Sequence, residues 1–259
     1  MELNELFSCR DKIALVTGAS RGLGKAMAEG LIAAGATVVI TSRKYEDLEL
    51  VKKELSDKYK DAKIYIYEYD HSNWRESDKL IDKIESEVGE IDILINNAGT
   101  GLLAEIGKMT NEQWQYIMDL NLSSQMALSR RVIPNMTKKQ WGRIINTASL
   151  FGACVLENRT AYCSSKGAVI MFTKALAVEA AQYSPNITVN SISCGPMKTP
   201  LMKDSWENLE KRRFLEDITA LKRWGRPEDV VGAILLLASE AGSYITGHNI
   251  FIDGGASAK

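Results

Sequence analysis

Three residues, Ser149, Tyr162 and Lys166, have the types and the spacing that proton transfer to a carbonyl oxygen requires. Tyr162 and Lys166 lie four residues apart in the run YCSSK, which puts both side chains on one face of a helix. A tyrosine with its ordinary pKa of ~10 is a poor base at neutral pH, and a lysine cation one turn away favours the phenolate. We therefore expect Lys166 to lower the pKa of Tyr162, while Ser149 holds the substrate oxygen. Alone, this spacing is common in helices, where it usually reflects an ordinary side-chain contact.

A glycine-rich run, TGASRGLG at residues 17–24, is the second chemical signal. It follows an apolar run and opens an amphipathic one, so a strand, a turn and a helix are expected in that order. Glycines let the backbone approach a pyrophosphate, and the helix N-terminus favours its negative charge. The glycines are spaced GxxxGxG instead of GxGxxG, and a glycine-rich turn alone is weak support for a nucleotide. The residues predicted to contact a dinucleotide here are Gly18, Ser20, Arg21, Gly22, Leu23 and Gly24.

The end of the second predicted strand, Thr41-Ser42-Arg43-Lys44, carries no acidic residue. An enzyme that uses NAD usually has an acid near this point, bonded to the ribose hydroxyls. Arg43, with Arg21 from the glycine turn, can instead pair with a 2′-phosphate, and Ser42 lies beside it. The pattern favours NADP(H) over NAD(H), although both arginines could be plain surface residues.

Strand-like and helix-like runs alternate along the whole chain. This alternation predicts an α/β fold: a single-domain, Rossmann-type, doubly wound parallel sheet of about seven strands with helices on both faces, over residues 1–259. Ser72 is expected to cap one helix, and Pro134 to lie near the end of another. Residues 197–221 carry no strand signal and are predicted to form a helical insertion that covers the substrate. Strands are expected at 12–17, 37–41, 63–68, 91–95, 143–147, 187–192 and 249–252, and helices at 22–34, 44–59, 72–88, 110–133, 161–182 and 227–237.

With these motifs in order, the chain resembles the short-chain dehydrogenase/reductase family over nearly its whole length. The resemblance implies an NADP(H)-dependent oxidoreductase that interconverts a ketone and a secondary alcohol, with Tyr162 as general acid and base. The matching motifs are TGASRGLG at 17–24, Asp70, NNAG at 96–99, Asn121, Ser149, YCSSK at 162–166, NSISCGPMKT at 190–199 and GHNIFIDGG at 247–255.

The resemblance also implies roles for individual residues. Asn121 would join Ser149, Tyr162 and Lys166 as a catalytic residue, holding a water through a distortion of its helix. Tyr162 and Lys166 would also contact the cofactor. Cys194-Gly195 stands where the family usually has Pro-Gly, which would bring Cys194 close to the cofactor. The remaining cofactor contacts would be Asp70 at the adenine, His71 through its backbone, Asn97, Ala98 and Gly99 at the ribose, and Pro196, Met197 and Thr199 near the carboxamide.

Two groups within the family are similar to this chain, and they imply different substrates. Gluconate 5-dehydrogenase-like members imply a sugar acid or polyol, whereas 3-oxoacyl-[acyl-carrier-protein] reductases imply an acyl thioester. Pro134 and Val178 occupy the positions of two carrier-docking arginines, which disfavours the thioester, although Arg130 and Arg131 could substitute. A non-catalytic dinucleotide-binding protein is a third reading, disfavoured because Tyr162 and Lys166 are both present. Selectivity is expected from residues 150–160 and 197–221.

Composition excludes several other classes of protein. The chain carries 32 basic and 33 acidic residues without a basic patch, so no nucleic-acid partner is expected. No apolar run reaches the ~20 residues of a membrane span, and the N-terminus is unlike a secretion signal, so a cytoplasmic protein is expected. Four cysteines without a CxxC pair, beside only two histidines, predict no metal site. The resemblance implies a homotetramer or dimer that pairs through 110–133, 161–182 and 249–252.

Overall fold

A seven-stranded parallel sheet forms the centre of the molecule in the computed structural model, which describes residues 2–259 and leaves Met1 outside. The strand order is β3-β2-β1-β4-β5-β6-β7. All strands are parallel, and the order in which the chain adds them changes direction between β1 and β4, which is the topological switch point. The predicted doubly wound, Rossmann-type sheet is therefore confirmed. The strands are β1 Ile13–Thr17, β2 Thr37–Ser42, β3 Ile64–Glu68, β4 Ile93–Asn96, β5 Gly142–Thr147, β6 Ile187–Cys194 and β7 Asn249–Ile252.

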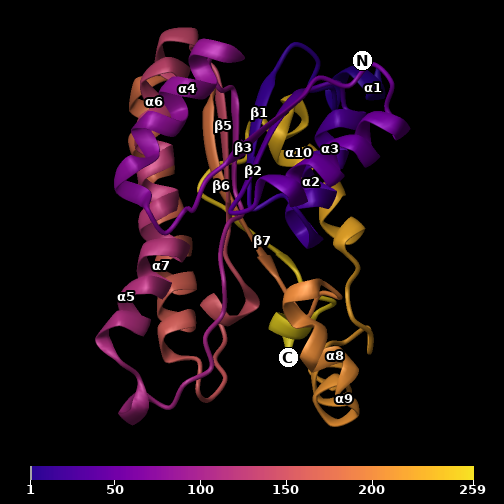
Figure 1. The fold of residues 1–259 in the computed structure, drawn as a ribbon, viewed down its shortest axis with the longest axis vertical. Helices are drawn as coiled ribbons and strands as arrows, with labels where there is room; N and C mark the ends of the chain where they lie inside the picture. Colours follow the sequence, from indigo (N-terminus) through magenta and orange to yellow (C-terminus); the bar gives the residue numbers. More distant parts are fainter. Residues whose placement is uncertain (1) are drawn as a thin grey trace.

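Helices cover both faces of this sheet, and Figure 1 shows α2, α3 and α10 on one side with α4, α6 and α7 on the other. Successive side chains of a strand point to opposite faces, so each central strand contributes to two cores. In β1, Ala14 and Val16 join the core under α2 and α10, whereas Leu15 joins the core under α4 and α6. The helices are α1 Leu3–Leu6, α2 Gly22–Ala33, α3 Tyr45–Lys58, α4 Ser77–Glu87, α5 Asn111–Met118, α6 Ser124–Lys139, α7 Thr160–Tyr183, α8 Lys203–Glu207, α9 Leu209–Asp217 and α10 Val231–Ala238.

The expected cap at Ser72 is wrong. The Ser72 hydroxyl donates to Oδ1 of Asp70 at 2.8 Å, and its backbone N–H donates to the same oxygen at 2.9 Å. Asp70 thus closes a local turn with its own side chain, as aspartate commonly does after a strand. A short 3-10 turn at Trp74–Glu76 follows, and α4 begins only at Ser77.

The predicted helix at 110–133 starts where expected but is divided and longer. Thr110 caps α5 through a capping box with Gln113. A π-helical turn at Asp119–Ser123 then joins α5 to α6, which continues past Pro134 to Lys139. Pro134 lies on the exposed side of α6, where solvent can reach the carbonyl group that it leaves without a donor. A proline there does not have to end the helix.

The segment at 197–221 is helical, as predicted. It comprises a 3-10 turn at Pro200–Met202 followed by α8 and α9. Buried Trp224 anchors its far end by donating its indole N–H to the Arg212 carbonyl oxygen at 3.4 Å. Figure 1 shows α8 and α9 beyond one end of the sheet, near the C-terminus. Within residues 2–259, no helix has both the length and the apolar character that crossing a bilayer takes.

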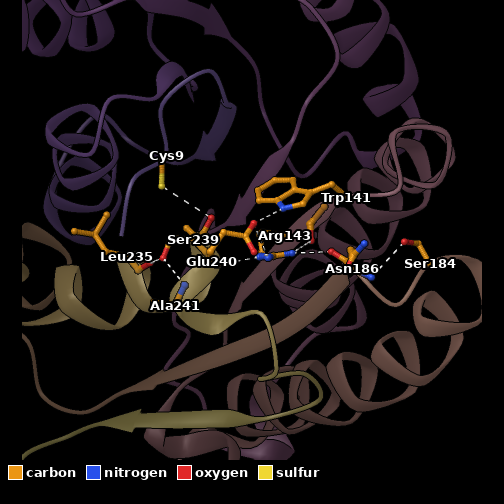
Figure 2. A network of polar contacts seen from close by, with 11 residues as sticks. Cys9, Trp141, Arg143, Ser184, Asn186, Leu235, Ser239, Glu240 and Ala241 are labelled. Carbon is orange, nitrogen blue, oxygen red and sulfur yellow. Dashed lines mark hydrogen bonds and ion pairs between the residues drawn. The ribbon is translucent and has the colours of Figure 1, made fainter. Parts of the chain in front are cut away.

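A buried arginine closes the opposite, amino-terminal end of β5, and Figure 2 shows the network around it. Arg143 is 1% exposed and donates to the carbonyl oxygens of Asn186 at 2.7 Å and Ser239 at 3.3 Å. Its guanidinium lies 4.4 Å from the ring centre of Trp141, whose indole N–H donates to Glu240 at 2.7 Å. Burial lowers the pKa of Arg143, while Glu240 opposes that shift. The network joins β5, β6 and α10 far from the glycine-rich turn.

Candidate active site at the carboxyl ends of the strands

The glycine-rich turn after β1 has backbone angles and close contacts that favour glycine. Gly18 and Gly22 adopt left-handed conformations, with φ of 64° and 57°. A Cβ on Gly18 would lie 3.0 Å from the Cα of Ala98. A Cβ on Gly24 would collide with the carbonyl oxygen of Gly18 and lie 2.6 Å from Nδ2 of Asn97. The turn is therefore packed tightly against the loop that follows β4.

Side chains from β1 and β4 hold this turn against the sheet. The Thr17 hydroxyl accepts the backbone N–H groups of Asn97 at 2.9 Å and Ala98 at 2.8 Å. In return, Nδ2 of Asn97 donates to the carbonyl oxygens of Thr17 at 2.9 Å and Gly18 at 3.1 Å. Asn97 thus supports the turn with its side chain, a role beside the ribose contact that the resemblance implied. Thr17 is a supporting residue that sequence reasoning did not single out.

Asn121 lies in the π-helical turn, so the helix distortion that the resemblance implied is present. Its fully buried side chain accepts the Thr100 N–H at 2.9 Å and donates to the Thr100 carbonyl oxygen at 2.9 Å. It also donates to the Ser165 hydroxyl at 3.1 Å. Because a π-turn inserts one residue into the helix, it redirects Asn121 inward, toward the loop after β4.

Gly99 lies between Asn121 and Lys166. A Cβ on Gly99 would lie 3.0 Å from Oδ1 of Asn121 and 3.4 Å from Nζ of Lys166. The glycine therefore lets the buried amide and the buried ammonium approach the same stretch of backbone. Asn121 of the π-helical turn and Lys166 of α7, which were predicted from different motifs, are thus brought together near the end of β4.

Ser149, Tyr162 and Lys166 meet beyond the end of β5. Ser149 caps a 3-10 turn at Leu150–Gly152, where its hydroxyl accepts the Phe151 N–H at 3.1 Å. Tyr162 and Lys166 belong to the first turns of α7, and Lys166 Nζ donates to the carbonyl oxygen of Thr147 at 2.7 Å. The last residues of β5 therefore position both the serine and the lysine.

The expected lowering of the Tyr162 pKa by Lys166 is wrong for this arrangement. Burial raises the pKa of Tyr162, against smaller lowering effects from the Ser149 hydroxyl and the Arg159 cation. Burial also lowers the pKa of Lys166 to about 8. The ammonium is directed at the Thr147 carbonyl oxygen, so it compensates little of the cost of placing a phenolate in a buried site. Tyr162 is accordingly a protonated phenol at neutral pH.

Cys194 lies beside this group, at the end of β6. Burial raises the pKa of its thiol to about 12, and Lys166 opposes the shift. Such a thiol stays protonated and is a poor nucleophile. After it, Gly195 packs closely on the next strand, since a Cβ there would lie 2.7 Å from the Cα of Asp253. The replacement of the family's usual proline leaves the turn intact.

The two arginines expected at a 2′-phosphate lie at the surface. Arg21 and Arg43 are both exposed, and neither forms an ion pair or side-chain hydrogen bond within residues 2–259. Ser42 next to Arg43 is buried, and its hydroxyl donates to the Lys44 carbonyl oxygen at 3.1 Å. Ser42 thus supports the backbone at the end of β2.

His71 is buried after β3 and has a side-chain contact that the sequence did not predict. Its Nε2 lies 2.8 Å from the Thr41 hydroxyl, at the end of β2. Burial lowers the pKa of His71 to about 4, so the imidazole is neutral at physiological pH. Asp70 beside it turns one carboxylate oxygen toward Ser72. The ends of β2 and β3 are thereby joined next to the predicted adenine position.

The segment after β6 reaches the glycine-rich turn. A Cβ on Gly22 would lie 3.3 Å from the Cβ of Thr199, so these two residues are in contact. The Pro196 carbonyl oxygen accepts the Gly225 N–H at 2.9 Å, and Met197 is buried against Gly225. Residues 196–199 therefore border the open end of the turn on the side of the helical segment.

Comparisons with known proteins place this geometry in a family. A family model described as Enoyl-(Acyl carrier protein) reductase matches residues 18–257. The 2-dehydro-3-deoxy-D-gluconate 5-dehydrogenase of Formosa agariphila is 35% identical, over 97% of this chain and 94% of that protein. A 3-oxoacyl-[acyl-carrier-protein] reductase of Haemophilus influenzae is 37% identical, over 94% of this chain and 97% of its own length.

A solved structure agrees with both. It is a gluconate 5-dehydrogenase from Burkholderia cenocepacia in complex with NADP and tartrate, with a TM-score of 0.93, 29% identity and complete coverage of both chains. The chain belongs to the short-chain dehydrogenase/reductase family, whose members are oxidoreductases that act on CH–OH groups.

Proposed function

We propose that this protein is an NADP(H)-dependent oxidoreductase that interconverts a ketone and a secondary alcohol, with a sugar acid or polyol as substrate. The observation that supports this most is the convergence of Ser149, Tyr162, Lys166 and Asn121 around the ends of β4 and β5. That group lies at the same edge of the sheet as a backbone cradle in which Gly18 and Gly22 have left-handed φ angles and a Cβ on Gly24 would collide. In an open parallel sheet, ligands bind at this edge, where the strand order reverses.

The residues present fit a dinucleotide that carries a 2′-phosphate. The Gly18–Gly24 turn opens α2, whose N-terminal amides and dipole suit a pyrophosphate. Arg21 and Arg43, which have no protein partner in the described part of the chain, would take the 2′-phosphate, and Thr199 and Met197 would border the nicotinamide. When bound, the nicotinamide supplies or accepts the hydride. The remaining contacts at the adenine and ribose are proposed for Asp70, His71, Ala98 and Gly99.

The protein's own contribution to reduction is the proton. Ser149 holds the carbonyl oxygen of the substrate, and the protonated phenol of Tyr162 donates to that oxygen. Lys166, with a pKa of about 8, can then return a proton to the Tyr162 phenolate. Asn121, bonded to Ser165 and next to Lys166 across Gly99, would hold the water that connects this lysine to solvent.

A sugar acid is favoured over an acyl thioester because Arg131 on α6 is already paired with acidic side chains of this protein. Arg131 forms ion pairs with Asp82 at 2.6 Å and Glu85 at 2.9 Å, so it is poorly placed to bind an acidic carrier protein. Val178 is 69% exposed on α7 and carries no charge. Of the two arginines that could substitute for the docking pair, Arg130 is itself 4.0 Å from Asp78.

The experiment compares NADPH oxidation with 5-keto-D-gluconate and with an acetoacetyl thioester. We expect turnover of the keto acid to exceed that of the thioester in kcat/KM. Turnover of the thioester alone would contradict the sugar-acid part of the proposal. Absence of turnover with any ketone, while NADPH still binds, would favour a non-catalytic dinucleotide-binding protein.

We also propose a cytoplasmic homotetramer, or a dimer, as the assembled form. Its support is apolar surface on two elements: Met171 and Val178 on α7 are 62% and 69% exposed, and Phe251 on the edge strand β7 is 38% exposed. The four free cysteines suit a reducing compartment. Sedimentation velocity decides the assembly, and a monomer at micromolar concentration would contradict it.

A further inference from the structure

We infer that Arg159 binds the carboxylate of the substrate and thereby selects acids over neutral ketones. The inference rests on the proposed function, because it takes the reacting carbonyl to lie at Tyr162. Arg159 is not part of any motif by which the chain was recognised. Its position between two segments of the site, and its unmatched charge, support this role.

Arg159 directly precedes the helix that carries Tyr162, and its guanidinium contacts the turn that follows Ser149. It is the residue before α7, so Tyr162 follows one turn later on the same side of the helix. On the other side, its guanidinium carbon lies 5.3 Å from the ring centre of Phe151. Phe151 in turn donates its backbone N–H to the Ser149 hydroxyl. The guanidinium is thus held between the serine turn and the tyrosine helix.

Hydrogen bonds fix the backbone around Arg159. Asn158 adopts a left-handed conformation with φ of 59°, and its carbonyl oxygen accepts the Ala104 N–H at 3.0 Å. The Arg159 carbonyl oxygen accepts the Cys163 N–H at 2.8 Å. The backbone at Arg159 is therefore fixed before an anion binds, which reduces the conformational entropy that binding would cost.

The charge of Arg159 has no counterpart within the described part of the chain. The residue is half-buried, and no carboxylate of residues 2–259 pairs with it. The first turn of α7 carries no acidic residue, so the positive end of the helix dipole adds to the same charge. The cation also acts to lower the pKa of Tyr162. A planar guanidinium in this setting suits a carboxylate, which it binds through two parallel hydrogen bonds.

Two other cations lie near the reaction centre, and their contacts differ from those of Arg159. Lys166 is buried and donates to the Thr147 carbonyl oxygen. Lys198 extends over the ring of Trp206, 4.3 Å from its centre, at the start of the helical segment. Lys198 and Arg159 each lie over an aromatic ring and keep their hydrogen-bond donors, but Arg159 is the one held beside the serine turn and at the start of the tyrosine helix.

Binding of two probes tests the inference directly. D-Gluconate and D-sorbitol differ by a carboxylate in place of a hydroxymethyl group, and neither reacts with NADPH. Each is titrated by calorimetry into NADPH-loaded wild type, Arg159→Gln and Arg159→Lys. We expect gluconate to bind Arg159→Gln about 10- to 100-fold more weakly than wild type, the loss of a charge-assisted pair, with partial recovery in Arg159→Lys. Sorbitol should bind wild type and Arg159→Gln alike.

Kinetics separate this inference from the proposed function. In Arg159→Gln, KM for 5-keto-D-gluconate should rise, and kcat/KM should fall by a much larger factor for 5-keto-D-gluconate than for the neutral ketose D-fructose. The matched control is Arg130→Gln, an exposed arginine on α6, which should change neither value. Thermal unfolding of Arg159→Gln should coincide with that of wild type.

Two results would overturn the role of Arg159. One is equal affinity of wild type and Arg159→Gln for gluconate, which leaves the proposed function standing if 5-keto-D-gluconate is reduced. The other is gluconate binding no more tightly than sorbitol in wild type. Failure of wild type to reduce any ketone would instead contradict the proposed function, and the titrations would still decide whether Arg159 holds a carboxylate.

Discussion

Tyr162 and Arg43 are the residues on which the proposed chemistry and coenzyme preference depend most. Burial keeps Tyr162 protonated, so the resting site is poised to donate a proton, which is what reduction of a ketone needs. Arg43 has the opposite character, being exposed and without a partner in the part of the chain that the structure describes. Burial therefore sets the protonation of Tyr162, and the unpaired charge of Arg43 is the basis of the proposed NADP(H) preference.

We predict that Arg43→Gln lowers kcat/KM for NADPH by about 10-fold or more and leaves kcat/KM for NADH nearly unchanged. The reason is that a charge-assisted bond to the 2′-phosphate is lost, and NADH lacks that phosphate. Steady-state kinetics with both coenzymes measure it, with Lys53→Gln on α3 as a charge-matched control. A wild-type ratio of kcat/KM that favours NADH would contradict the NADP(H) assignment.

At the residue scale, the spacing of the sequence was sufficient to find the reactive group but not its contacts. Tyr162 and Lys166 share a helix, so their proximity follows from helical geometry. The hydrogen bond from Lys166 to Thr147 depends on how α7 packs against β5, which no local pattern encodes. The same holds for the direction of the Tyr162 pKa, because desolvation depends on the complete fold.

The elements that position the site are the glycine-rich turn, the π-helical turn and α7. The strands were predictable because buried parallel strands are continuous apolar runs. The helix boundaries were less predictable where side chains compete for backbone groups, as Asp70 does at Ser72. The π-turn at Asp119–Ser123 leaves no periodic signal of its own, and only the resemblance pointed to a distortion at Asn121.

We predict that Gly24→Ala weakens NADPH binding by at least about 10-fold. Its Cβ would collide with the Gly18 carbonyl oxygen and displace the turn from its position on Asn97. Gly232→Ala is the matched control, because a Cβ there meets nothing within 4 Å and the residue lies in α10. This control should bind NADPH normally and be no less stable than wild type. Equal NADPH affinity in Gly24→Ala and wild type, measured by fluorescence titration, would contradict the role given to the turn.

For the whole molecule, we propose that residues 1–259 form one dinucleotide-binding catalytic domain. The site occupies the carboxyl edge of the sheet, and the Arg143 network closes the amino edge. That network was not predictable from sequence, because it joins Trp141 to Glu240, 99 positions apart. Binding and stability are thus assigned to opposite edges of the sheet.

We predict that Arg143→Met destabilises the protein by about 3 kcal/mol without changing KM for NADPH. The substitution leaves the carbonyl oxygens of Asn186 and Ser239 without their buried donor. Glu240→Gln should cost less than about 1 kcal/mol, because that carboxylate is exposed. Urea unfolding followed by tryptophan fluorescence should show a single transition in each variant. A change in Arg143→Met below about 0.5 kcal/mol would contradict a structural role for this arginine.

The central claim, that Tyr162 supplies the proton, is tested most directly by Tyr162→Phe. Phenylalanine keeps the buried ring and removes only the hydroxyl, so packing is preserved and at most one hydrogen bond to the coenzyme is lost. With NADPH and the ketone that wild type reduces fastest, kcat should fall by about 100- to 10,000-fold, while the Kd for NADPH rises by no more than about fivefold. A kcat comparable to that of wild type would contradict the mechanism.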